Sequence, residues 1–315
     1  MDNFLFAVNA VFPLFLLMAV GFGLRFTKIG SKEFFSKANM LCFKVLLPVM
    51  LFVNIYELTP SDGADLRYIW LAVLGTLVVA VAAMIILPLI VKDRKKIGVL
   101  AQAFFRSNFL IFGVPMVRNM FGESELWATS VLLPIVIPLF NVLAVIVLSI
   151  YINEDHSIKG LKKTFIGILK NPLILGAIFA YIVKLSGITI PAPIFSAADS
   201  LGSMASPLAL LALGGTLKFS TIGKNFRYLF AACGMKLLIT PALTIPVAIF
   251  MGFRGSTIGA LLALFASPVA VSSYVMAEAS GNDGELAGQI VALSTAASIP
   301  TMFFWVLILR SLGAL

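Results

Sequence analysis

Two short polar segments interrupt apolar stretches of this sequence, and both carry residue types that can bind a small ligand. The first is Arg106-Ser107-Asn108, followed by Gly113 and Pro115; the second is Ser267-Pro268, followed by Ser272 and Ser273. A proline within a helix removes a backbone hydrogen bond and clashes with the preceding turn, so we expect broken helices here. Helix ends and Arg, Asn and Ser side chains inside a membrane would bind an anion or a cation. The alternative is that each segment is an ordinary proline kink whose Ser and Asn side chains pack between helices.

Three basic residues also lie inside apolar stretches, namely Lys44, Arg106 and Lys236. A charge at that depth is costly and usually faces an aqueous cavity or a partner. Together they predict a positive site for an anionic substrate. For Lys44 and Lys236 the alternative is that the side chain extends to the membrane interface.

A single carboxylate, Glu278, ends the apolar stretch that follows Pro268. It could bind a coupling cation or carry a proton, and the alternative is an ordinary helix-terminal charge. We therefore leave Na⁺ and H⁺ open as coupling ions and expect no other cofactor.

Residues for catalysis or for a metal centre are missing from the apolar stretches. The only histidine, His156, lies in a charged segment, and Cys42 and Cys233 are far apart. A Ser-His-Asp set or a histidine-rich metal site cannot be assembled, so we expect no enzyme and no metal site. The net charge of +9 comes from cations in short loops, which argues against nucleic-acid binding.

The composition predicts an all-α polytopic membrane protein. The chain is 60% hydrophobic and 12% charged, more apolar than a soluble domain could bury. Several charge-free runs are long enough to cross the hydrocarbon core as helices. We predict ten spans, near residues 4–24, 36–57, 68–91, 97–120, 126–152, 164–184, 194–216, 228–252, 256–278 and 286–310.

The loop charges predict the orientation of these spans. Lysines and arginines gather in alternate loops, around residues 25–37, 92–96, 159–170 and 218–227. By the positive-inside rule these loops are cytoplasmic, and both termini are external. We expect a retained first helix and a location in the cell (inner or plasma) membrane.

The sequence also contains an internal repeat. Residues 97–104, IGVLAQAF, are echoed by residues 258–265, IGALLALF, and a polar break follows both. The copies are about 160 residues apart, which leaves room for five spans in each repeat. An odd number of spans places the copies in opposite orientations, so we expect two inverted repeats, 1–152 and 164–315, joined by a connection at 153–163.

The motifs at the two breaks resemble those of the auxin efflux carrier family, which includes plant auxin exporters and bacterial permeases for malonate and malate. They are Asn108…Gly113-Val114-Pro115 and Ser267-Pro268, supported by LPVMLF at 47–52 and KLLITP at 236–241. The resemblance implies a fold like that of the bile acid sodium symporters, with a panel (scaffold) domain and a core (transport) domain. In such a fold broken helices four and nine cross in the core, which moves like an elevator. The bile acid symporters bind sodium with a Ser-Asn pair in span four and a Glu late in span nine, and Ser107-Asn108 and Glu278 resemble these residues. The loop between spans five and six is short here, unlike that of the plant exporters.

We therefore predict a secondary active transporter of a small organic anion, a mono- or dicarboxylate. Arg106 would neutralise the anion, Asn108 would hydrogen-bond it, and Pro115 and Pro268 would keep the helices broken. A sodium-coupled symporter and a passive anion channel are the alternatives. The lipid bilayer is an expected partner, and we expect a homodimer through the scaffold.

Overall fold

The computed structural model describes residues 2–57, 65–151, 172–216 and 225–315. Within these ranges the regular structure is helical, apart from one isolated bridge. Six helical segments in the described ranges are long and apolar enough to cross a membrane: Lys32–Glu57, Leu66–Ile90, Trp127–Ile150, Ala192–Thr216, Phe226–Phe250 and Gly284–Ser311. The predicted all-α, multi-pass class is confirmed.

The described ranges contain the following helices. Those up to residue 151 are α1 (Asp2–Leu24), α2 (Lys32–Leu41), η1 (Cys42–Leu46), α3 (Leu47–Glu57), α4 (Leu66–Ile90), α5 (Arg94–Phe105), η2 (Phe109–Gly113), α6 (Val114–Phe121), η3 (Glu123–Glu125) and α7 (Trp127–Ile150). Those from residue 172 are α9 (Pro172–Leu185), α10 (Ala192–Ser203), α11 (Ala205–Thr216), α12 (Phe226–Gly234), η5 (Met235–Ile239), α13 (Thr240–Phe250), α14 (Ser256–Ala266), α15 (Ser272–Ala279) and α16 (Gly284–Ser311). The predicted connection at 153–163 and the start of the predicted sixth span lie outside the described residues.

Prolines widen three of these helices without ending them. The π-helical turns η1, η2 and η5 each end two residues before a proline, at Pro48, Pro115 and Pro241. A proline lacks the N–H that the carbonyl four residues earlier would accept, and a wider turn relieves the clash between them. Four residues before Pro241, the carbonyl of Leu237 accepts a hydrogen bond from Trp305 Nε1 at 2.9 Å. A side chain thus satisfies the acceptor that the proline leaves free.

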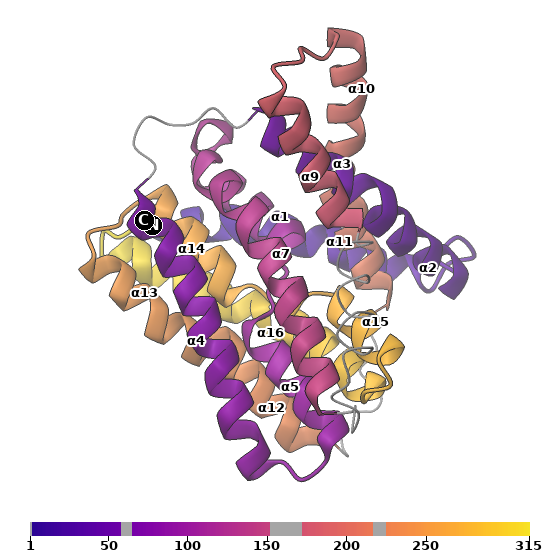
Figure 1. Cartoon of the computed structure of the whole chain (residues 1–315), viewed down its shortest axis with the longest axis vertical. Helices are drawn as coiled ribbons and strands as arrows, with labels where there is room; N and C mark the ends of the chain where they lie inside the picture. The colour runs from indigo at the N-terminus through magenta and orange to yellow at the C-terminus, as the bar shows by residue number, and fades with distance from the viewer. Residues whose placement is uncertain (1, 58–64, 152–171, 217–224) are drawn as a thin grey trace.

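The helices pack in two sets. The first helix group consists of α1, α2, α3, α9, α10 and α11, and the second of α4 to α7 and α12 to α16. In Figure 1, α2, α3, α9 and α10 lie on the opposite side of the molecule from α4, α12 and α13. The two groups meet mainly along α1, which contacts α6 and α16, and also where α11 contacts η2 and α7 contacts α3 and α9.

Glycine allows the close contact between α1 and α11 inside the first group. A Cβ added to Gly214 would lie 1.9 Å from the Met18 carbonyl oxygen, and one added to Gly21 would lie 1.9 Å from that of Leu211. Side chains at these positions would force the backbones apart, so this contact requires glycine.

The centre of the second group is formed by the two repeated segments. All residues of 258–266 in α14 are buried, and so are residues 97–103 of α5. Their ends therefore lie inside the protein, where exposed backbone groups need partners other than water.

Candidate functional site

The chain leaves helical geometry at both predicted breaks. Helix α5 ends at Phe105, Arg106 is extended (φ −77°, ψ 117°), and a helix resumes at Phe109. Helix α14 ends at Ala266, Ser267 is extended (φ −62°, ψ 151°), and α15 begins at Ser272. Ser267 precedes Pro268, and a residue before proline avoids helical geometry. In the first segment the break precedes Pro115, which lies within α6, so the proline adjusts a helix that the polar residues have already interrupted.

The two breaks cross each other. Asn108 donates its backbone N–H to the carbonyl of Pro268 at 2.8 Å, and Ser107 forms an antiparallel bridge with Val269. The side chain of Gln102 donates to the Ser273 carbonyl at 3.0 Å, which ties α5 to α15. The carbonyl ends of α5 and α14 and the amide ends of η2 and α15 thus lie around one point. Helix ends carry partial charges, so this crossing can interact with ligands of either sign.

Arg106 is buried at the crossing, with 3% of its surface exposed. Its guanidinium donates to Asn141 Oδ1 at 2.7 Å, Ser272 Oγ at 2.9 Å and Gln102 Oε1 at 3.2 Å, and it contacts the Met276 sulfur at 2.6 Å. These partners are neutral, and no described carboxylate lies within ion-pair distance of Arg106. A buried charge normally has a counter-charge, so this arrangement favours an anion at the crossing.

Several polar atoms around the crossing are buried and have no hydrogen-bond partner in the described structure. They include the hydroxyls of Ser107, Ser267 and Ser273 and the Nδ2 of Asn108. The hydroxyls of Thr240 and Thr295, on neighbouring helices, are also buried without a hydrogen-bond partner in the described structure. Buried polar groups are nearly always hydrogen-bonded, and each unpaired group costs about 1–3 kcal/mol. Their concentration here indicates a site for a ligand or for water.

Of the other two predicted cations, one lies near the crossing. Lys236 is completely buried in η5, and its Nζ lies 3.5 Å from the Leu264 carbonyl in α14. Lys44 is exposed on η1, in the first helix group, and the structure does not bring it together with Arg106.

Gly113 and Pro115 shape the approach of η2 and α6 to α14. A Cβ on Gly113 would lie 2.8 Å from the Phe109 ring and 3.1 Å from Ala263 Cβ, so glycine permits this contact. Pro115 is buried in the first turn of α6.

Glu278 belongs to α15, but its side chain lies outside the described residues.

The sequence reading missed the neutral partners of Arg106. Gln102 and Asn141 belong to apolar stretches, and an amide side chain within such a stretch is itself a signal of a polar contact. Ser294 of α16 was also missed; its hydroxyl accepts the Val269 N–H at 3.2 Å and so supports the second break.

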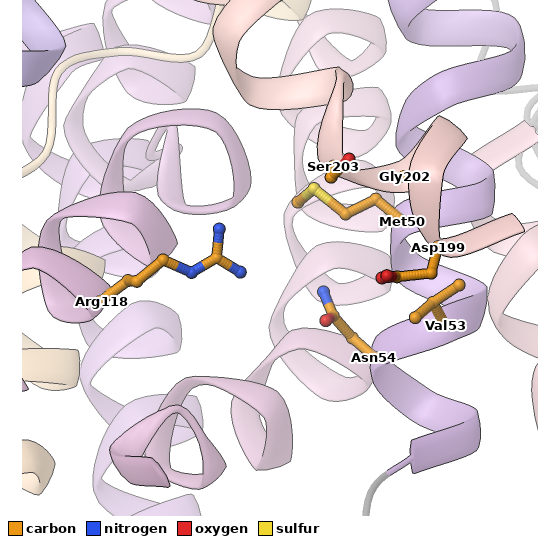
Figure 2. A pocket seen from close by; sticks show the side chains of 7 residues that line it. All are labelled: Met50, Val53, Asn54, Arg118, Asp199, Gly202 and Ser203. Carbon is orange, nitrogen blue, oxygen red and sulfur yellow. The ribbon is translucent and has the colours of Figure 1, made fainter. Parts of the chain in front are cut away.

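A separate open cleft lies between the two helix groups. It is lined by Met50, Val53 and Asn54 of α3, by Asp199, Gly202 and Ser203 of α10, and by Arg118 of α6. Figure 2 shows the Arg118 side chain pointing across the gap towards Asn54 and Asp199. Arg118 Nε also lies 2.8 Å from Glu123 Oε1. None of the crossing residues lines this cleft. It lies at the boundary between the two helix groups.

The family described as "Membrane transport protein" matches residues 6–159 and 153–306 of this chain. The chain belongs to this auxin efflux carrier-like family of membrane transport proteins. This transporter is also similar to an "Uncharacterized transporter" of Methanothermobacter thermautotrophicus, with 24% identity over 317 residues that cover 97% of this chain and 99% of the relative. The family predicted from the two motifs is thus confirmed, and the crossing lies in a multi-pass membrane transporter.

Proposed function

We propose that this protein is a secondary active transporter of a small organic anion, a mono- or dicarboxylate, which binds at the crossing. The observation that carries the proposal is the buried Arg106 guanidinium, which contacts only neutral groups among the described residues. A carboxylate would supply the missing counter-charge and accept two hydrogen bonds from the planar guanidinium, one from Nε and one from a terminal nitrogen that gives up a neutral partner for it.

The unpartnered donors give the remaining contacts to the anion. Asn108 Nδ2 and the hydroxyls of Ser107, Ser267 and Ser273 have no partner in the described part of the chain and can donate to an anion. Ser272 presents its hydroxyl beside Arg106, and the amide ends of η2 and α15 favour negative charge. Pro268 keeps the second helix open, while Gly113 and Pro115 hold η2 and α6 against α14.

An elevator-type motion would give this site access to both sides of the membrane. The second helix group would move as the core and the first would act as the static scaffold. The cleft between α3, α10 and α6 supports such a boundary. The order of helices in α1 to α7 parallels that in α9 to α16, which supports two inverted five-helix repeats. We also propose that both termini are external, that the protein lies in the cell membrane, and that the scaffold forms a homodimer.

Flux measurements with purified protein in liposomes test the proposal. Labelled acetate and malonate serve as probes, and we expect uptake of at least one of them that depends on Arg106. Arg106→Gln should abolish this uptake, while Arg67→Gln, which removes an exposed arginine beside Asp65, should leave it unchanged. Accumulation against a gradient would separate a carrier from an anion channel. Transport restricted to neutral or cationic compounds would refute the proposal.

A further inference from the structure

We propose that the Lys236 ammonium is a resident cation of the transport site, occupying the carbonyl end of α14 where another carrier would bind a coupling metal ion. This inference rests on the proposed function only in taking the crossing as the transport site. Broken helices in membrane carriers commonly use their carbonyl ends to coordinate Na⁺. Here a side chain of the protein lies at such an end.

The sequence leaves a carbonyl free at this position. In a continuous helix the Leu264 carbonyl would accept the N–H of the residue four positions later, which is Pro268 and has none. The Nζ of Lys236 lies 3.5 Å from this oxygen. The last carbonyls of a helix also carry its negative partial charge, so a cation is stabilised there.

The described charged groups around Lys236 do not provide a closer counter-charge. Helices α5, α12, α13, α14 and α16 pack against η5. The charged or titratable residues of these helices are Arg94, Lys95, Lys96, Arg227, Tyr228, Cys233, Glu285 and Arg310. Arg106, which directly follows α5, is also charged. The only carboxylate in this set, Glu285, accepts a hydrogen bond from Gln289 Nε2 at 3.1 Å. Among described residues no carboxylate lies within ion-pair distance of Lys236, so the carbonyl end of α14 is the negative group that it faces.

The position of Lys236 is set by the fold and does not depend on a flexible side chain at the surface. Lys236 belongs to the π turn that precedes Pro241, and the next residue, Leu237, accepts the Trp305 hydrogen bond that ties this turn to α16. The side chain is completely buried, so its ammonium cannot extend to the interface. The hydroxyl of Thr240, one turn further along the same helix face, has no partner within the described ranges.

A resident cation has a direct consequence for coupling. An ammonium is compact and has three donors, so it can replace a monovalent metal ion at a helix end. It would travel with the second helix group in both directions. Transport should therefore need no sodium, unlike the sodium-coupled alternative that the sequence left open.

The first test uses the unmodified transporter. Its melting temperature in detergent and its carboxylate uptake in liposomes should be the same in sodium, potassium and choline chloride. A melting temperature or an uptake rate that rises with sodium alone, with the effect lost in Glu278→Gln, would overturn the proposal. The melting comparison does not depend on which substrate is carried, so it separates failure of this inference from failure of the carboxylate assignment.

The second test replaces the cation chemically. Lys236→Ala leaves space for a small amine, and we expect at least a tenfold loss of uptake that ethylammonium restores. Lys236→Met is the matched control, because it fills the space without a charge and should not be rescued. Ethylammonium should also raise the melting temperature of Lys236→Ala and leave that of Lys236→Met unchanged, since a ligand that binds only the folded state stabilises it. Uptake by Lys236→Ala equal to that of the unmodified protein would overturn the proposal. A folded Lys236→Ala that no amine rescues would do the same.

Discussion

Replacing Arg106 with glutamine should weaken carboxylate binding by at least about 100-fold. A carboxylate that binds the guanidinium accepts two hydrogen bonds from a charged donor, and each is worth about 1.5–3 kcal/mol. Their sum at the lower limit is about 3 kcal/mol, and every 1.4 kcal/mol corresponds to a factor of about ten in the dissociation constant. Glutamine keeps a donor for Asn141 or Ser272 but has no charge.

The same substitution should leave the empty protein as stable as before or more so. Arg106 is buried beside neutral partners, and removing a buried charge that has no counter-charge among the described residues relieves its desolvation cost. Loss of binding with retained stability distinguishes an arginine that serves the ligand from one that holds the helices together.

The assay is thermal unfolding of the purified transporter over a titration of the carboxylate that it carries. The dissociation constant is read from the rise in melting temperature with ligand concentration. Arg67→Gln is the control for loss of an arginine outside the crossing, and its dissociation constant should not change. A constant for Arg106→Gln within threefold of that of the unmodified protein would refute the reasoning. A melting temperature far below that of the unmodified empty protein would show instead that the arginine is structural.

Three further substitutions test other parts of the structure. Asn108→Ala should reduce uptake without changing the melting temperature, because its Nδ2 has no partner among the described residues; unchanged uptake would exclude the amide from the site. Trp305→Phe should destabilise the protein by about 1–3 kcal/mol, since the Leu237 carbonyl loses its donor, and chemical denaturation would measure the loss. Gly214→Ala should lower the yield of folded protein on gel filtration, because its Cβ would collide with the Met18 carbonyl; a normal yield would mean that α1 and α11 can separate without cost.

The sequence predicted the helices and the two breaks well because these depend on local properties. Long apolar runs define the spans, and the pairs Ser107-Asn108 and Ser267-Pro268 consist of residue types that favour helix ends. The role of Pro115 was harder to predict. Its position within α6 shows that a proline can be accommodated by a π turn, while the break lies earlier at Arg106–Asn108.

By itself the sequence determined the membrane class, the family and the segments that could form a site. Only the tertiary structure decided which of the three cations belong to the crossing, because burial and partners depend on helices that are distant in the chain. Arg106 and Lys236 are enclosed by the second helix group, whereas Lys44, with a similar sequence setting, is exposed on the first. The neutral partners of Arg106 on α7 and α15 come from up to 170 positions away, and no local pattern encodes a contact of that range.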